Sequence, residues 1–271
     1  MSNTDAGALL VDAHVHIYDC FDINKLLDAA LRNFKCAANK LGVDDGFTGV
    51  LLLAETSQDN WFQQASMSGA HGHWQIDKTP DKTVLLTRPS TDTADNKNII
   101  YIMAGRQIIT AEGLELLALA TDSVFEDGLS ITAALSAVRE HDAIPVLPWA
   151  VGKWLGKRGK LLSGLLKTEA NSDLCLGDNS GRPVFWRNPS HFRKAIKSNM
   201  RLLPGTDPLP FSSEAGRVGS FGFMIQGKLT NTQPSTDLKQ LLRNNTLQIT
   251  AYGQLEMPLR FIANQVRLRI S

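Results

Sequence analysis

Residues 9–18 read Leu-Leu-Val-Asp-Ala-His-Val-His-Ile-Tyr, an apolar run that carries two histidines two positions apart. Residues at this spacing on a β-strand point to the same side of the strand. His14 and His16 can therefore meet one ion at the C-terminal end of a strand, since neutral imidazole is a common nitrogen ligand for zinc and similar metals. The alternative is that the two histidines lie at a strand end and only solvate a loop.

The bulk composition is that of an ordinary globular protein. The chain has 271 residues, of which 43% are hydrophobic and 20% are charged, and its formal net charge is +1. This length suits one large domain, and a charge near zero favours neither nucleic acid nor an anionic membrane as a partner. The N-terminus lacks the basic region of a signal peptide, and no apolar run reaches membrane-spanning length. We therefore expect a small-molecule partner, with no nucleic acid and no membrane.

The spacing of the cysteines indicates the redox state of the cellular compartment. Cys20, Cys36 and Cys175 are widely spaced and form no Cys-x-x-Cys pair, so no disulfide framework is expected. A reducing cytoplasm is the natural compartment for such a chain.

Strand-like and helical patterns alternate along the chain. Apolar runs at residues 9–17, 47–55 and 144–149 are typical of buried strands, and residues 24–41 and 129–140 have helical spacing. Such alternation implies a parallel sheet, and the number of units predicts closure into a (β/α) TIM-like barrel, either regular or distorted with seven strands.

This pattern predicts one α/β barrel domain over residues 1–271. Turn-rich sequences between short strand-like pieces predict a small antiparallel insertion at about 70–110. The end of the chain, at about 235–271, is expected to be helical.

Polar residues end or directly follow several of the predicted strands. In an α/β barrel these positions line the active face. The alternative for each isolated carboxylate is a helix cap or a turn former. The residues at such positions are His14, His16, Glu55, Glu115, Trp149, Lys153, Asp178 and Asp207.

Two short motifs carry a resemblance to a known family. Asp12-x-His14-x-His16 and Gly205-Thr206-Asp207 resemble the first and last motifs of metal-dependent barrel hydrolases, shared by the amidohydrolase superfamily and the PHP (polymerase and histidinol phosphatase) family. Residues 104–110 and 115–119 are similar to the G-x-E-I-T and H-I-L-x-L segments of the PHP family. The resemblance spans most of residues 9–210 and implies a metal-dependent hydrolase.

The chain also departs from the PHP pattern. Gln107 stands where the family has a metal-binding Glu, and Glu115 and Trp149 stand where it has later histidines. Pro208 follows Asp207, and the final histidine of the family is absent. A full cluster of two or three ions is therefore not expected.

The ligands that remain can hold one divalent ion, which would be Zn, Mn or Fe. Two nitrogens from His14 and His16 and one oxygen from Asp207, with an open position, form a plausible catalytic set. Glu55, Glu115 or Asp178 could add a further oxygen.

These residues predict a hydrolase that uses metal-activated water on a phosphoester, ester or amide bond of a small anionic substrate. Asp207, assisted by Asp178, is the predicted catalytic base. The predicted substrate-binding residues are Lys153, Arg182, Gln107 and Trp149.

Two other functions stay open. One is a degenerate, non-catalytic barrel that binds an anionic small molecule. The other is metal-independent lyase or hydrolase chemistry, carried by Asp178 or Asp207 together with Lys153.

Overall fold

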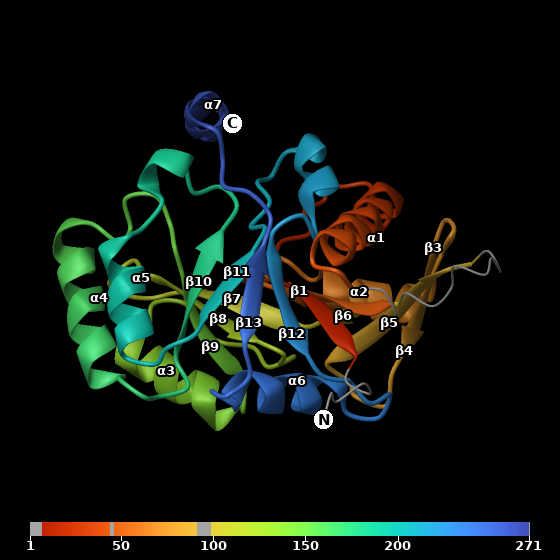
Figure 1. The fold of residues 1–271 in the computed structure, drawn as a ribbon, viewed down its shortest axis with the longest axis horizontal. Coiled ribbons are helices and arrows are strands. Elements are labelled where there is room, and N and C mark those ends of the chain that lie inside the picture. The colour runs from red at the N-terminus through yellow and green to blue at the C-terminus, as the bar shows by residue number, and fades with distance from the viewer. Residues whose placement is uncertain (1–6, 44–45, 91–98, 271) are drawn as a thin grey trace.

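The protein was analysed as a computed structural model, which describes residues 7–43, 46–90 and 99–270 (Figure 1). The start of the chain, for which the sequence predicts no signal peptide, and residues 91–98 of the predicted insertion lie outside the described residues. Within the described part, no helix is both long and apolar enough to cross a membrane.

The strands form two sheets. The larger sheet has eight strands, in the order β13-β12-β1-β2-β6-β5-β4-β3, and the smaller has five, in the order β11-β10-β9-β8-β7. The larger sheet consists of β1 (Ala8–Val15), β2 (Phe47–Leu53), β3 (Ala70–His71), β4 (Trp74–Lys78), β5 (Val84–Pro89), β6 (Ile100–Met103), β12 (Gly222–Gln226) and β13 (Ile249–Tyr252). The smaller consists of β7 (Gly105–Ile109), β8 (Glu115–Leu119), β9 (Ile144–Pro148), β10 (Cys175–Asn179) and β11 (Leu202–Gly205).

The predicted TIM-like barrel is wrong, in its regular and in its seven-stranded form, because neither sheet closes within the described residues. The reason lies in the connections. Parallel neighbours need a crossover of a dozen or more residues, usually a helix, but β7 and β8 are joined by a tight turn at Gly113, which has a φ of +73°. These two strands therefore pair antiparallel, and β8 pairs antiparallel with β9.

The two sheets approach each other without forming a continuous ladder. At one edge they are linked by an isolated bridge between Glu55 and Arg106. Strands β3 to β6, in the region of the predicted antiparallel insertion, pair antiparallel but extend the larger sheet.

Seven α-helices are seen in the described residues, and most cover the outer faces of the sheets (Figure 1). They are α1 (Ile23–Lys40), α2 (Trp61–Ser68), α3 (Ile131–Glu140), α4 (Gly156–Thr168), α5 (Ser190–Lys197), α6 (Pro234–Arg243) and α7 (Pro258–Ile270), together with the short 3-10 helices η1 (Val184–Trp186) and η2 (Ser212–Arg217). The segment at about 235–271, which the sequence predicts to be helical, contains α6, then β13, which pairs with β12, and then α7.

The strand that carries the histidines is buried on both faces. Leu9, Val11 and Ala13 pack against the smaller sheet, whereas Leu10 and Val15 pack under α1. Such a strand is expected to be apolar along its whole length rather than alternating. Helix α6 closes the space between the sheets at one end through Leu238 and Leu242.

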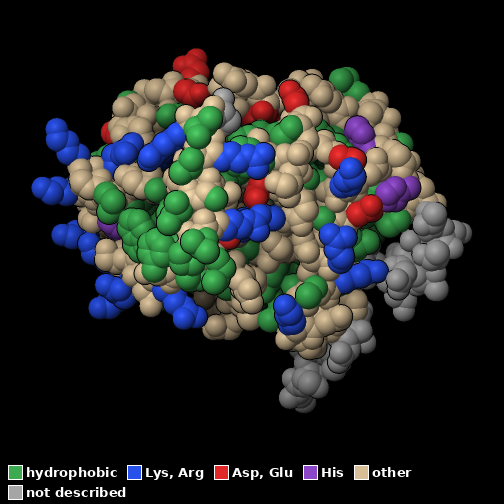
Figure 2. Space-filling view, turned by 90° about the horizontal axis from the view of Figure 1, so that it is seen from above, with side chains coloured by type: hydrophobic (Ala, Val, Ile, Leu, Met, Phe, Trp, Pro, Cys, Tyr) green, Lys and Arg blue, Asp and Glu red, His purple; other side chains and the backbone are tan. Residues whose placement is uncertain are grey.

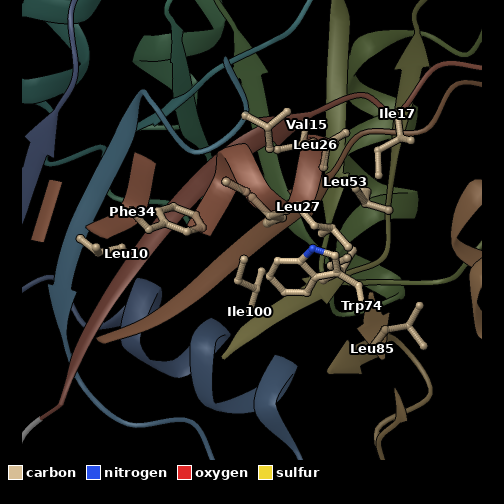
Figure 3. Close-up of a cluster of buried hydrophobic side chains, with 14 of the residues drawn as sticks. Leu10, Val15, Ile17, Leu26, Leu27, Phe34, Leu53, Trp74, Leu85 and Ile100 are labelled. Carbon is tan, nitrogen blue, oxygen red and sulfur yellow. The ribbon is translucent and has the colours of Figure 1, made fainter. Parts of the chain in front are cut away.

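Helix α1 fixes the outer layer of the larger sheet (Figure 3). Asp22 caps its first turn by accepting a hydrogen bond from the main-chain nitrogen of Lys25 at 3.2 Å. Its Phe34 ring lies over Gly49 of β2, where a Cβ atom would come within 2.8 Å of the ring. Glycine at position 49 is therefore what lets the helix pack closely on the sheet.

Candidate metal centre

His14 and His16 meet at the C-terminal end of β1, as their spacing predicts. Their Nε2 atoms lie 3.0 Å apart, and both rings are buried. Asp207, which follows β11, brings its Oδ1 atom to 3.6 Å from Nε2 of His14 and 3.7 Å from Nε2 of His16. Among the described residues, this is the one group of three or more His, Cys, Asp or Glu side chains with such convergent ligand atoms.

The backbone holds Asp207 in place. Its main-chain nitrogen donates a hydrogen bond to the carbonyl oxygen of His14 at 2.8 Å, and its φ is +49°, in the left-handed region. At Gly205 any Cβ atom would overlap the main-chain nitrogen of His14. The close approach of β11 to β1 thus requires a glycine two residues before the carboxylate.

A buried carboxylate on β1 reinforces this approach. Asp12 accepts hydrogen bonds from the main-chain nitrogen of Thr206 at 2.7 Å, from its hydroxyl at 2.5 Å, and from the nitrogen of Gly219 at 2.9 Å. Burial raises the pKa of Asp12 to about 7, although these hydrogen bonds oppose the shift. Asp12 is therefore a positioning residue that fixes the loop carrying Asp207.

The three ligand atoms fit a single metal ion. Their separations define a circle with a radius of about 2.0 Å, close to the ~2.0–2.2 Å that zinc keeps from imidazole nitrogens and carboxylate oxygens. Burial lowers the pKa of His14 and of His16 to about 4, so both rings are neutral and able to coordinate at pH 7. The buried Nδ1 atom of His16 lacks a hydrogen-bond partner among the described residues. The donor set and its spacing therefore suit a divalent cation.

Asn179, which the sequence analysis did not single out, orients the carboxylate of Asp207. Its Nδ2 atom donates to Oδ2 of Asp207 at 2.8 Å and to the carbonyl oxygen of Trp149 at 2.7 Å. Burial raises the pKa of Asp207, while His16, Asn179 and Lys153 act in the opposite direction. The carboxamide thus leaves Oδ1 of Asp207 facing the histidines.

Asp178, the neighbour of Asn179, points to the other face of β10. Both of its oxygens accept from Arg182, at 2.7 and 2.6 Å, and Arg182 also donates to the carbonyl oxygens of Trp186 and Arg187. Asp178, predicted to assist the base Asp207, and Arg182, predicted to bind the substrate, thus pair with each other on the face of β10 opposite the histidines. The alternation of side chains along β10 separates them from the centre.

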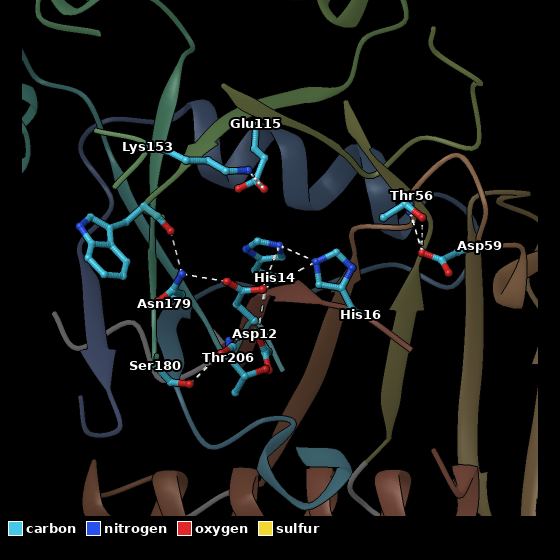
Figure 4. A network of polar contacts seen from close by, with 12 residues as sticks. Asp12, His14, His16, Thr56, Asp59, Glu115, Lys153, Asn179, Ser180 and Thr206 are labelled. Atoms are coloured by element: carbon cyan, nitrogen blue, oxygen red, sulfur yellow. Dashed lines mark hydrogen bonds and ion pairs between the residues drawn. The ribbon is translucent and has the colours of Figure 1, made fainter. Parts of the chain in front are cut away.

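Three other predicted residues lie beside the histidines. The Nζ atom of Lys153 contacts the carboxylate of Glu115 directly (Figure 4). Glu115 and the side chain of Gln107 lie close to His14 and favour its protonated form. They raise the pKa of His14, but burial lowers this pKa by more. Lys153 and Glu115 therefore place a cation and a carboxylate beside the three convergent ligands.

Glu55 and Trp149 have other contacts. Glu55 accepts from the main-chain nitrogen of Phe62, at the start of α2, at 2.7 Å and pairs with Arg106 at 3.3 Å. It lies on the wall of a separate cavity of 510 Å³. The ring of Trp149 is buried and packs edge-on against Trp186, with ring centroids 5.6 Å apart.

Tyr18 is a further neighbour of the centre that the sequence analysis did not select. Its ring stacks on His16 with centroids 5.5 Å apart. It lies two residues beyond His16, so the same spacing that pairs the histidines also indicates Tyr18.

Comparisons with known proteins show a shared fold and no family. No family model matches the chain, and no curated protein matches it. Among solved structures, PsfC from Pseudomonas syringae PB-5123 is similar with a TM-score of 0.55 and 13% identity, over 98% of this chain and 100% of PsfC. A two-domain protein from Bacteroides vulgatus ATCC 8482, described as containing a predicted PHP-like metal-dependent phosphoesterase, has a TM-score of 0.43 and 12% identity, over 92% of this chain and 65% of its own. The likeness to PsfC shows the fold alone, and membership of the PHP family stays a prediction.

Proposed function

We propose that this protein is a metal-dependent hydrolase of the PHP or amidohydrolase type, which cleaves a phosphoester, ester or amide bond of a small anionic substrate. The observation that carries the proposal is the triangle of the buried His14 and His16 with the partly exposed Asp207, whose size matches one divalent ion. Zn, Mn and Fe are the candidate ions. When bound, such an ion supplies an electrophile and activates water for attack.

The neighbouring residues fit the remaining steps. Lys153 is the cation at the mouth of the centre, and an anionic substrate group would replace Glu115 as its partner. Glu115 would then be free to accept a proton from the attacking water. Gln107, beside His14, would contribute a neutral hydrogen-bonding group to the substrate.

In the proposed reaction Asp207 is a metal ligand, and Asn179 holds it in position. Asp178 is left out of the reaction because Arg182 occupies both of its oxygens. The predicted base thus becomes Glu115, a carboxylate near His14 with a single lysine partner.

Metal analysis combined with activity assays tests this proposal. Purified protein is loaded in turn with Zn, Mn and Fe, dialysed and analysed for bound metal, with the His14→Ala/His16→Ala double variant beside it. We expect about one equivalent of ion in the wild type and its loss in the variant, since two of three ligands are gone. His141→Ala, which removes an exposed imidazole on α3's C-terminal side, is the matched control and keeps the metal.

The loaded protein is then assayed on p-nitrophenyl phosphate, bis(p-nitrophenyl) phosphate and p-nitrophenyl acetate. Chelator-sensitive turnover that is absent from the double variant supports a hydrolase. Binding of phosphate that survives both chelator and the double variant, with no turnover, would favour the non-catalytic binding protein. A wild-type chain that takes up no metal under any loading condition overturns the proposal.

A further inference from the structure

A second cavity lies at the same edge of the sheets as the candidate metal centre. It has a volume of 510 Å³ and is bounded by α2, the turn between β4 and β5, and the junction of β6 and β7. The pairing of the strands explains its position. Val84 of β5 pairs with Met103 at the end of β6, and Leu53 at the end of β2 pairs with Val15 of β1. A cavity of this size is large enough for a small organic ligand.

Strand β7 separates this cavity from the metal centre. Arg106 and Gln107 are neighbours on β7, so their side chains point to opposite sides of the strand. Gln107 lies beside His14, whereas Arg106 lines the cavity. The described residues that line the cavity include none of the three convergent ligands. The cavity is therefore a site of its own and not an extension of the centre.

The guanidinium of Arg106 has one edge engaged and one edge free. Its Nη1 atom donates to the carbonyl oxygen of Asp59 at 3.0 Å and lies 3.3 Å from Oε2 of Glu55. Its Nε and Nη2 atoms have no partner among the described residues, and neither is sealed inside the protein. Because the side chain lines the cavity and is 20% exposed, this free edge is accessible from the cavity.

Arg182 shows what such an edge binds in this protein. Its Nε and Nη2 atoms donate to the two carboxylate oxygens of Asp178 at 2.7 and 2.6 Å. Two parallel donors on a planar guanidinium match the two oxygens of a carboxylate, and this bidentate geometry is among the stronger hydrogen-bonding arrangements. The free edge of Arg106 offers the same pair of donors to a carboxylate from outside the chain.

The unpaired charges around the cavity also favour an anion. Lys78 and Lys82 are exposed and have no carboxylate partner in the part of the chain that the structure describes. Glu55 and Asp81 each use both oxygens within the protein, so Asp122 is the one lining carboxylate left without a described partner. Figure 2 views the molecule from above and shows Lys and Arg side chains, with some Asp and Glu, on the side where β4 and β5 lie in Figure 1. The lining groups that remain free thus carry a net positive charge.

The inner wall of the cavity is apolar. Phe62, Val84, Leu85 and Ala104 line it and are buried. An apolar group that packs on these side chains leaves water, which is favourable in proportion to the area buried. Pockets for small molecules typically combine such apolar walls with a few polar groups that fix the orientation of the ligand. Arg106 is a polar group of that kind here.

We propose that this cavity is a second ligand site, which binds an organic anion with an apolar body and a carboxylate head group. The head group accepts hydrogen bonds from Nε and Nη2 of Arg106, and Lys78 and Lys82 attract it to the opening. The apolar body packs on the wall that includes Phe62 and Leu85. The site needs no metal ion, so it stands independently of the proposed hydrolase activity.

Calorimetric titration of the full chain in EDTA, with 1-naphthaleneacetate as the probe, tests the head group and the apolar body separately. We expect binding of 1-naphthaleneacetate and at least about 10-fold weaker binding of the neutral 1-naphthaleneacetamide, which lacks the charge and one acceptor oxygen. Acetate should bind at least about 100-fold more weakly, because it lacks the apolar body. Equal affinities for the acid and its amide overturn the proposal.

Substitution of Arg106 tests the paired donors. Arg106→Lys keeps the positive charge and removes the pair, so the dissociation constant for 1-naphthaleneacetate should rise about 10-fold or more. Arg32→Lys, at an exposed position of α1, is the matched control and should bind as the wild type does. Lys78→Met/Lys82→Met changes only exposed side chains, which keeps a test available if Arg106→Lys misfolds. It should weaken binding at low salt and reduce the salt dependence of the dissociation constant. Unchanged affinity in either folded variant overturns the proposal.

Three other outcomes overturn it as well. One is a wild type that shows no binding at millimolar 1-naphthaleneacetate. Another is binding that is lost in His14→Ala/His16→Ala, which would assign the carboxylate to the metal centre. The third is 1-naphthyl phosphate that binds at least about 10-fold more tightly than 1-naphthaleneacetate, which would assign a phosphate head group to the cavity. Failure of the proposed hydrolase activity would leave these results unaffected, because every titration is done without metal.

Discussion

The main-chain nitrogen of Asp207 is hydrogen-bonded to the carbonyl oxygen of His14 at 2.8 Å, so the last ligand of the candidate centre is attached to the first. The two residues come from different sheets, and this contact is made where β11 meets the end of β1. The geometry of the ligand triangle therefore depends on how closely the two strands approach. Any change that separates them should affect metal affinity as well as stability.

Gly205→Ala tests that dependence. A Cβ atom at this position overlaps the backbone of His14, which cannot move without displacing a ligand. We expect a loss of about 1–3 kcal/mol in the free energy of unfolding, as for overpacked cores, together with weaker metal binding. Urea denaturation and a competitive chelator titration measure the two effects.

The control for this substitution is Gly164→Ala in α4, where nothing lies within 4 Å of the new methyl group. Alanine is favoured over glycine in helices by about 1 kcal/mol, so this variant should be slightly more stable and bind metal normally. Wild-type stability and metal affinity in Gly205→Ala would contradict the close approach.

Asn179→Ala should weaken metal binding and leave the fold largely intact. The carboxamide holds Oδ2 of Asp207, and loss of such a partner to a ligand typically costs about 10–100-fold in metal affinity. Asp178→Asn is the matched comparison on the opposite face of the same strand. It leaves the buried Arg182 without its carboxylate, so it should cost about 3 kcal/mol of stability and leave metal affinity unchanged. If Asp178→Asn weakens metal binding and Asn179→Ala does not, Asp178 rather than Asn179 supports the centre.

This contrast shows what the sequence could and could not predict of the centre. The pairing of His14 with His16 depends only on the two-residue spacing along one strand, and it was predictable. The choice between Asp178 and Asn179 depends on which face of β10 points inward. Cys175 packs between the sheets and Leu176 packs outside, so residue 179 shares the inner face with Cys175. Only the structure reveals that Cys175 is the inner residue, because both it and Leu176 are apolar.

The fold was predictable strand by strand but not as a whole. Apolar runs marked β1, β2 and β9 correctly, because each is buried on both faces. Closure into a barrel failed at the connection between β7 and β8, where the chain turns back within five residues, 110–114. Residues 104–110 resemble a PHP motif, and that resemblance does not predict the antiparallel pairing of β7 with β8.

Lys153→Ala should selectively impair anionic substrates under the proposed function. Loss of a charge-assisted hydrogen bond costs about 1.5–3 kcal/mol, which corresponds to a fall in kcat/KM of roughly 10- to 150-fold for p-nitrophenyl phosphate. Neutral p-nitrophenyl acetate should be affected much less. Lys157→Ala, which removes an exposed cation at the start of α4, is the control and should behave as the wild type. Equal losses for both substrates would place Lys153 in a structural role with Glu115.

Cys175 predicts a loss of stability at alkaline pH. Burial raises the pKa of its thiol from 9.0 to about 12, so the folded protein keeps the proton after the unfolded chain has lost it. The contribution of the protonated thiol to the free energy of unfolding is fully present below pH 9. It falls by about 1.4 kcal/mol per pH unit as the pH rises towards 12. Other groups also titrate in this range, so the measurement is the difference in urea midpoint between wild type and Cys175→Ala at pH 8, 9.5 and 10.5. We expect the wild type to lose stability relative to Cys175→Ala as the pH rises. In the folded protein at pH 8, Ellman's reagent should detect only the exposed Cys20 and Cys36. A pH-independent difference, together with three reactive thiols under native conditions, would show that Cys175 is accessible to solvent and that the inner face of β10 is open there.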